Sequence, residues 1–488
     1  MRILADISLF GIVVIPFIGA IAIALAAHRP WLRDSFCWLF PLAFFLPIVS
    51  LTPDVIAGTD ATQILITLLP GLEIAFAARP LGLLFALLAS TLWLLATPYA
   101  LGYMKQGGYQ QLGRFMACYA IALGAVAGIA FAENLFTLYI FYEILSISTY
   151  PLVAHTGTEK ARAGARTYLA VLLVTSVGLM LPAIIWIWQA TGSLRFTSGG
   201  IMAGEISSTS GAVLLLLLLF GIGKAALMPF HRWLPAAMVA PTPVSALLHA
   251  VAVVKAGVFS VLTVVLYIFG LDYLLTLVTQ PAMLYLAVFT MLAASLVALH
   301  QDNLKARLAY STVSQLAYIV TGALLATELA AIGGGLHMLM HGFGKITLFF
   351  CAGAIYLGSG INTVSGMNGL GRRMPITMIA FFIGAMSVIG LPPTGGFWSK
   401  LYLVTGAFSA EYYWVVAAFM LSTLLNIGYL IPPVMRAFLL PANDPNAMAH
   451  AREAPLLCLI PLSLTAVGTV VLFFLATSAL ALLRPAIP

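Results

Sequence analysis

The chain has 488 residues, of which 62% are hydrophobic and only 8% carry a charge. Because about a quarter of the residues of a soluble protein are charged, this composition excludes a soluble domain. The formal net charge of +7 is dispersed along the chain and forms no basic block. It therefore indicates orientation in a membrane and does not indicate nucleic-acid binding.

The apolar runs predict an all-α polytopic membrane protein with 14 transmembrane helices, since the runs have about 20 residues whereas barrel strands have about 10. They lie near 3–27, 36–51, 81–103, 113–131, 133–153, 165–189, 211–238, 243–269, 279–299, 305–326, 328–357, 375–405, 411–438 and 454–482. A signal peptide is the alternative for the first run. Its apolar part is too long and only Arg2 precedes it, so we interpret it as a retained span.

The basic residues of the loops test this count. The loops after odd-numbered spans hold Arg29, Arg33, Lys105, Arg114, Lys160, Arg162, Arg166, Lys305, Arg307, Arg372, Arg373, Arg436 and Arg452. The opposite side holds Arg2, Arg79, Arg195 and Arg484. Because the side richer in Lys and Arg is cytoplasmic, we expect both termini on the outer side of the membrane.

A small set of ionisable residues falls inside the apolar runs. These are Glu143, Lys224, Arg232, Lys255, Lys345 and Lys400. A lysine in hydrocarbon costs about 3 kcal/mol or more, and such residues usually mark ion or proton paths. The alternative is a side chain that reaches the headgroups, which suits Arg232 or Lys400 alone better than it suits the other four together.

Glu143 is the natural counter-charge for an embedded lysine, and we expect Lys224 to be its partner. Burial disfavours the charged forms of both groups, whereas pairing favours them. A Glu–Lys pair that opens and closes would therefore move a proton onto and off its lysine, as a proton relay requires. A static structural ion pair is the alternative.

Histidines accompany two of the lysines. His249 lies six residues before Lys255 in SALLHAVAVVKAGVF, and HMLMHGFGK places His337, His341 and Lys345 on one helix face. His-x-x-x-His is a possible metal pair, but no third ligand is evident and the lysine would repel a cation. We predict no metal site and a histidine–lysine proton path, with hydrated packing as the alternative.

Two apolar runs are interrupted by proline and glycine. KAALMPFHRWLPAAM contains Pro229 and Pro235, and IGLPPTGGFWSK contains Pro392 and Pro393. Irregular backbone at membrane depth is tolerated where it is buried or lines a cavity, and paired interruptions indicate inverted repeats. The match between halves is imperfect, because YSTVSQ in the tenth span offers hydroxyls and an amide where the fifth has an acid.

No cofactor is expected from the sequence. The cysteines Cys37, Cys118, Cys351 and Cys458 are scattered without a C-x-x-C spacing, so iron–sulfur and zinc sites are disfavoured. We expect all four to be packing residues. With no redox, hydrolytic or nucleotide motif, whether the chain belongs to an enzyme stays open.

Five ordered motifs resemble the antiporter-like proton-pumping subunits of respiratory complex I, membrane-bound hydrogenases and Mrp-type cation/proton antiporters. They are FYEILSISTYPL, GKAALMPFHRWLPAAMVAPTPVSALLHA, DNLKARLAYSTVSQ, HMLMHGFGKITLFF and LPPTGGFWSK. The resemblance implies two inverted five-helix repeats with discontinuous seventh and twelfth helices. The corresponding segments are 1–110 (three helices), 111–270 (first repeat), 279–438 (second repeat) and 454–488 (last helix).

The resemblance also implies roles for individual residues. Glu143 and Lys224 match the pair that gates proton entry; Lys255 and His249 match the eighth-helix group; His337, His341 and Lys345 match the eleventh-helix relay; Lys400 matches the twelfth-helix exit group. Whether Lys255 or His249 carries the proton is left open.

The function expected from this resemblance is proton translocation within a multi-subunit complex of a bacterial or archaeal cytoplasmic (inner) membrane. An Mrp D-type or hydrogenase-type subunit is favoured, and complex I stays possible. The expected partners are other membrane subunits, the lipid bilayer and protons, with sodium left open. The alternatives are a self-sufficient transporter of a small solute and a passive scaffold or quinone anchor.

Overall fold

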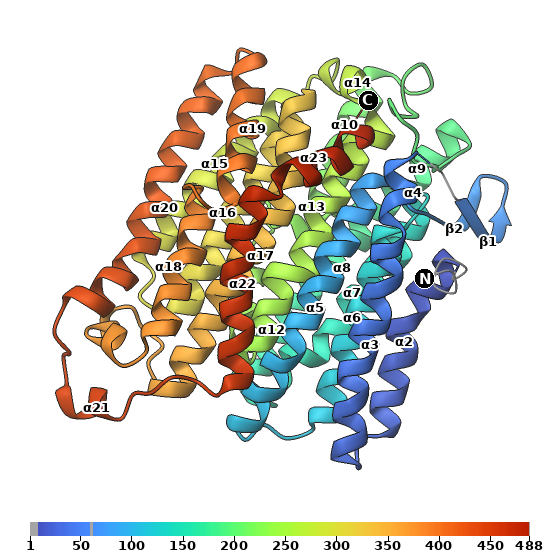
Figure 1. Ribbon diagram of the computed structural model, residues 1–488. Coiled ribbons are helices and arrows are strands. Elements are labelled where there is room, and N and C mark those ends of the chain that lie inside the picture. The colour runs from blue at the N-terminus through green and yellow to red at the C-terminus, as the bar shows by residue number, and fades with distance from the viewer. Residues whose placement is uncertain (1–7, 59–61, 488) are drawn as a thin grey trace.

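The computed structural model describes residues 8–58 and 62–487, which form a bundle of helices (Figure 1). Within these residues, 10 helices are long and apolar enough to cross a membrane. They are Pro30–Ile56, Pro80–Gln106, Leu112–Ala130, Leu135–Val153, Glu159–Thr191, Thr242–Phe269, Gln280–His300, Glu328–Ser359, Tyr413–Leu439 and Leu456–Phe474. The other four predicted runs contain a shorter, more polar or interrupted helix, so the total of fourteen spans stays a prediction.

The N-terminal part contains two long helices and a hairpin. α2 (Leu9–Leu25), α3 (Pro30–Ser50) and the short α4 (Thr52–Ile56) precede β1 (Thr62–Leu69) and β2 (Leu72–Ala77). The strands pair antiparallel, from Thr62 opposite Ala77 to Leu69 opposite Leu72. The all-α prediction is therefore wrong here: TQILITLL favours a strand through its β-branched residues, and Gly71 turns the chain with φ +75.

After the hairpin, the chain forms the helices of the first half of the bundle. They are α5 (Pro80–Gln106), α6 (Leu112–Ala130), α7 (Leu135–Val153), α8 (Glu159–Thr175), a π-helical turn (Ser176–Met180), α9 (Leu181–Thr191), α10 (Ser208–Gly221), α11 (Trp233–Ala236), α12 (Thr242–Ala246), a π-helical turn (Leu247–Val251), α13 (Val253–Val264), a π-helical turn (Val265–Phe269) and α14 (Leu271–Leu275).

The second half of the bundle is also helical. It contains α15 (Gln280–His300), α16 (Leu304–Leu324), α17 (Glu328–Ser359), α18 (Pro375–Ile389), α19 (Gly396–Ser409), α20 (Tyr413–Leu439), α21 (Pro445–Ala449), α22 (Leu456–Phe474) and α23 (Ala476–Leu483). In Figure 1, α22 runs along the front of the bundle and α23 bends across its upper end.

Two spans form the centre of the bundle. The most apolar stretches of Thr242–Phe269 and Glu328–Ser359 are 100% buried, whereas that of Leu456–Phe474 is only 33% buried. Outer helices expose large apolar side chains such as Phe289 and Leu424, as expected for helices that face lipid or other subunits. The first of these central spans carries His249 and Lys255, and the second carries His337, His341 and Lys345.

Both predicted interruptions are present. α10 ends at Gly221, Lys224 lies in a 3₁₀ turn (Gly223–Ala225), and Ala226 has φ +56. The helix therefore breaks several residues before Pro229. The second break separates α18 from α19 and begins at Gly390, which has φ +93. A chain that stops being helical inside the bundle frees backbone groups there, and buried neighbours must satisfy them.

The close approach of α13 to the first break depends on Gly257. A Cβ at this position would lie 2.3 Å from the Lys224 carbonyl carbon and 2.6 Å from its oxygen. We expect Gly257→Ala to lower the free energy of unfolding by about 1–3 kcal/mol, because these backbone atoms cannot move aside without shifting the turn. Thermal unfolding of the purified chain in detergent measures the effect.

Gly178→Ala is the matched control, because an added Cβ at Gly178 has open space within 4 Å. This variant should unfold at the wild-type temperature or slightly above it. Equal unfolding temperatures for the two alanine variants would show that α13 is not tightly packed against the break.

Candidate functional site

The first cluster of polar groups surrounds Lys224. The side chain is fully buried, and its Nζ donates to the Tyr142 carbonyl oxygen at 2.9 Å and to Ser146 Oγ at 2.6 Å. It also lies 3.1 Å from the centre of the Tyr142 ring. The Lys224 backbone N–H donates to Tyr142 Oη at 3.0 Å. The break in the helix thus places this lysine against α7, whose polar groups hold the ammonium.

Glu143 lies beside this cluster but makes no ion pair with Lys224 among the described residues. Both of its carboxylate oxygens are buried, and neither has a hydrogen-bond partner in the described part of the chain. The expected Glu143–Lys224 contact is therefore not formed in this structure. Ser146, one helical turn after Glu143 on α7, accepts a hydrogen bond from Lys224, as does the Tyr142 carbonyl. The lysine is therefore satisfied by neutral oxygens, and the Glu143 carboxylate is left without a partner among the described residues.

The second cluster lies at the centre of the bundle. Lys255 Nζ is hydrogen-bonded to His341 Nδ1, and both side chains are buried. The rings of His341 and His337 are stacked with centroids 5.7 Å apart. The four-residue spacing on α17 therefore brings the two histidines together, as the sequence predicts.

His249 lies in the π-helical turn before α13 and is fully buried. Neither ring nitrogen has a partner among the described residues. The ring packs on Phe349, with centroids 5.0 Å apart. Lys345 is likewise buried, and its Nζ donates to Ser311 Oγ at 2.7 Å. These two residues border the central cluster, but no hydrogen bond described here joins them to Lys255.

A chain of neutral polar groups leads from the central cluster to Lys400. His337 Nδ1 is 2.9 Å from Ser399 Oγ, and His337 Nε2 is 3.1 Å from Gln315 Oε1. With its amide oxygen toward these groups, Asn426 accepts hydrogen bonds from Gln315 Nε2 at 3.1 Å and from Lys400 Nζ at 3.0 Å. Lys255 and Lys400 are thus linked by contacts of histidine rings and two amides.

Sequence reasoning missed several of these residues. The motif YSTVSQ indicates Gln315 only as an amide where the fifth span has an acid, and no sequence pattern distinguishes Asn426, Ser146 or Ser399. A buried amide or hydroxyl is the available signal, because polar groups in a fully buried span need partners. The contacts themselves join residues up to 111 positions apart (315 and 426), and no local pattern indicates them.

The remaining ionisable residue of the apolar runs, Arg232, is exposed. It is therefore not part of either cluster, and the headgroup-reaching alternative suits it. Lys400 differs, since only 7% of its surface is exposed and its Nζ lies 4.6 Å from the Tyr318 ring centre. The same alternative does not suit Lys400.

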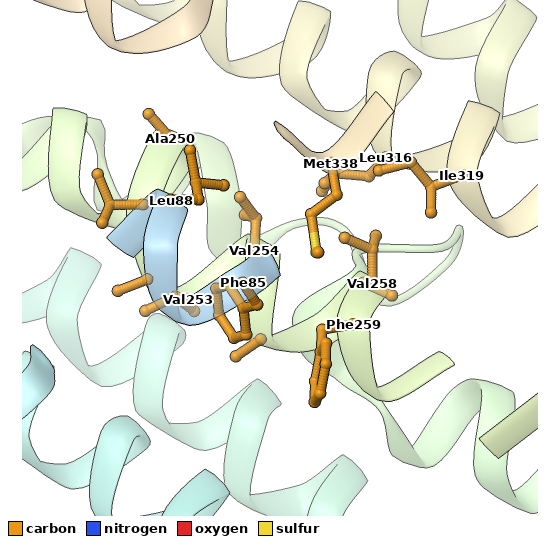
Figure 2. Close-up of a cluster of buried hydrophobic side chains, with 14 of the residues drawn as sticks. Phe85, Leu88, Ala250, Val253, Val254, Val258, Phe259, Leu316, Ile319 and Met338 are labelled. Carbon is orange, nitrogen blue, oxygen red and sulfur yellow. The ribbon is translucent and has the colours of Figure 1, made fainter. Parts of the chain in front are cut away.

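Buried apolar side chains fill the space between α5, α13, α16 and α17. Figure 2 shows Phe85 and Leu88 of α5 near Val253 and Val254 of α13, and Val258 of α13 below Leu316, Ile319 and Met338. Each of the last three is also buried. Since charges interact strongly in surroundings of low polarity, a proton on any one of these lysines or histidines changes the energy of the others.

Comparison with known proteins identifies the family of this chain. The pattern of the family described as "NADH:quinone oxidoreductase/Mrp antiporter, TM" matches residues 132–426, which include both breaks and every residue of the two clusters. The chain belongs to this family.

The alignment with this chain covers different shares of its relatives' lengths. The chain is 32% identical over 485 residues to NADH-quinone oxidoreductase subunit N of Desulforudis audaxviator, covering 94% of each chain. It is 33% identical over 361 residues to NAD(P)H-quinone oxidoreductase chain 5 of Synechocystis, covering 70% of this chain but only 51% of that one. The chain therefore spans nearly all of the first relative and about half of the second.

Solved structures share the whole fold. A chain of the Mrp complex from Dietzia sp. DQ12-45-1b superposes with a TM-score of 0.88 at 23% identity, covering 100% of this chain and 97% of that one. A chain of the archaeal membrane-bound sulfane sulfur reductase gives 0.86 at 23% identity, covering 97% and 96%. This chain thus shares its fold with both of these chains at low sequence identity.

Proposed function

We propose that this chain is a proton-translocating membrane subunit of a multi-subunit complex. The observation that carries the proposal is the buried series Lys255, His341, His337 and Lys400, connected through Gln315 and Asn426. The lysines and histidines can hold a proton, and the two amides between His337 and Lys400 donate and accept hydrogen bonds. A passive scaffold would have no use for buried lysines, whose charged form is costly at this depth.

In this proposal Glu143 and Lys224 control proton entry. The carboxylate of Glu143 has no partner while Lys224 is held by Tyr142 and Ser146, which corresponds to an open pair. Closing the pair would favour the charged lysine and opening it would favour proton release. Among the described residues no hydrogen bond joins Lys224 to Lys255, so transfer between the two clusters requires water or a change of side-chain conformation.

We further propose the finer layout that the sequence predicts. It consists of fourteen spans, inverted repeats at 111–270 and 279–438, and both termini on the outer side of a bacterial or archaeal cytoplasmic membrane. The two helix breaks, at Lys224 and just before Lys400, support this layout because they recur once in each proposed repeat.

The energy for transport would come from partner subunits. The relatives and structural neighbours are named as parts of quinone oxidoreductases, an Mrp complex and a sulfane sulfur reductase. This chain would pack its exposed apolar helices against such membrane subunits. Which of these assemblies it joins, and whether sodium is exchanged, are decided by the composition of the native complex.

Glu143→Gln tests the proposal. We expect the assembled complex carrying this substitution to transport protons about tenfold more slowly, because glutamine can neither stabilise the charged Lys224 nor exchange a proton. Proton uptake into proteoliposomes, followed with a pH-sensitive dye, measures the rate. Glu205→Gln is the control, since Glu205 is exposed in a loop. Unaltered transport in the Glu143→Gln complex would exclude a role for this carboxylate.

A further inference from the structure

A second series of buried polar groups connects Lys345 with Lys400 and joins the proposed proton path at Asn426. Lys345 Nζ donates to Ser311 Oγ of α16 at 2.7 Å. The Ser311 side chain interacts with the hydroxyl of Tyr429 on α20, and this hydroxyl is hydrogen-bonded to the Asn426 amide. Asn426 also contacts Lys400 Nζ, at 3.0 Å. All five side chains are buried, so the two lysines are the ends of one series of contacts.

The packing of α16 against its neighbour α20 produces this series (Figure 1). Arg307 Nη1 donates to the Tyr429 carbonyl oxygen at 3.0 Å. One turn later on α16, Ser311 interacts with the Tyr429 hydroxyl. One further turn along, Gln315 contacts Asn426 at 3.1 Å. Contacts thus move up α16 as they move down α20, so the two helices are antiparallel and their polar side chains face each other in register.

Neither lysine at the ends of the series has a counter-ion. Lys345 and Lys400 form no ion pair among the described residues, and α18, α19, α20 and α22 contain no Asp or Glu. Lys400 faces the ring of Tyr318 on α16 and, beyond Ser399, His337 on α17. The titratable groups that interact with Lys345 are Lys255, His249 and His341. Neutral hydrogen-bonding groups, together with repulsion between like charges, therefore decide which lysine holds a proton.

Asn426 can make its contacts in two orientations, because a half-turn of the amide exchanges its oxygen and nitrogen. In the first, the oxygen accepts from Lys400 Nζ, and the nitrogen donates to the Tyr429 hydroxyl oxygen. In the second, the oxygen accepts the Tyr429 O–H, and the nitrogen faces Lys400. A charged lysine has only donors and requires the first orientation, whereas a neutral lysine has a lone pair that can accept in the second.

The orientation of Asn426 fixes the direction of the hydroxyl bonds. When the Asn426 nitrogen donates to the Tyr429 oxygen, the Tyr429 O–H donates to Ser311. The Ser311 O–H is then available to the lone pair of a neutral Lys345. When Tyr429 donates to Asn426 instead, its oxygen accepts from Ser311, and Ser311 accepts from a charged Lys345. Each hydroxyl has a single hydrogen, so the two directions exclude each other.

We propose that Asn426 and Tyr429 are positioning residues that couple the two lysines, so that a proton on one favours the neutral form of the other. The inference rests on the proposed proton translocation and adds an order to its last steps: a proton that arrives at Lys345 favours release from Lys400. The series transmits the direction of its hydrogen bonds, and no proton passes through the amide.

The first test is the pH dependence of proton uptake into proteoliposomes that contain the assembled complex. Asn426→Asp places a carboxylate, which only accepts, beside Lys400 and favours its charged form. Proton release then needs a higher pH, so the profile should shift upward by about one pH unit or more. Asn426→Leu removes the acceptor and should shift the profile to lower pH. Damage to the fold alone would lower both rates without moving the two profiles in opposite directions.

Tyr429→Phe tests the same series with the loss of a single oxygen, which keeps the test valid when the Asn426 variants do not assemble. Uptake at pH 7 should fall about tenfold. Adding Ser311→Ala should slow it little further, because both substitutions interrupt one series. Tyr273→Phe is the matched control: it also loses a buried phenol hydroxyl, here bonded to the Ile206 carbonyl at 2.9 Å, and should transport as the wild type does.

Three results would overturn the coupling. They are profiles of both Asn426 variants that match the wild type, wild-type transport by Tyr429→Phe, and multiplied losses when Tyr429→Phe is combined with Ser311→Ala. If Glu143→Gln still slows transport in that case, the proposed proton translocation stands without the coupling. Absence of proton uptake by the wild-type complex would instead contradict the proposed function, and the coupling with it.

Discussion

The assembled complex with Lys224→Met is expected to translocate protons at least about a hundredfold more slowly than the wild type. Lys224 is fully buried at the first helix break, and its ammonium is held by the Tyr142 carbonyl and Ser146. Methionine retains most of the side-chain volume but cannot carry a proton. The loss should therefore concern transport and not folding, since removing a buried charge also removes its desolvation cost.

The measurement is proton uptake into proteoliposomes, with the unfolding temperature of the same preparation as a check on folding. Arg232→Gln is the matched control, since Arg232 lies in the same broken segment but is exposed and should retain wild-type transport. Normal transport in the Lys224→Met complex would contradict the relay, whatever the result for Glu143.

Lys255→Met is expected to have a loss of similar size, at least about a hundredfold. The Lys255 ammonium is hydrogen-bonded to His341, and His341 is stacked on His337. Removing the lysine thus disconnects the eighth span from the chain of contacts that ends at Lys400. If His249 alone carried the proton, Lys255 would be dispensable, because no hydrogen bond described here connects the two residues.

A double substitution makes this test sharper. If Lys255 and His341 act in one pathway, then Lys255→Met combined with His341→Gln should transport no more slowly than Lys255→Met alone. Lys160→Met, at an exposed position on α8, controls for the loss of a lysine. Wild-type transport by Lys255→Met would exclude Lys255 as a proton carrier, and multiplied losses in the double variant would show two separate routes.

Much of the fold follows from local patterns. Long apolar runs predict helices that cross a membrane because backbone groups in hydrocarbon must be satisfied within the segment. Prolines and glycines near Lys224 and Lys400 predict the two breaks for the same reason. The hairpin of β1 and β2 lies between two of the apolar runs, and its strands of 8 and 6 residues are too short to count as spans, so the pattern used to find spans does not indicate it.

The sequence by itself determined that this is a membrane-embedded helical protein, which ionisable residues are embedded, and that His337, His341 and Lys345 share a helix face. Only the tertiary structure decided which of them meet. It placed Lys255 against His341, inserted Gln315 and Asn426 before Lys400, and left Glu143 without its expected partner. The physical reason is that helix periodicity acts over a few residues, whereas contacts between buried polar groups depend on how distant helices pack.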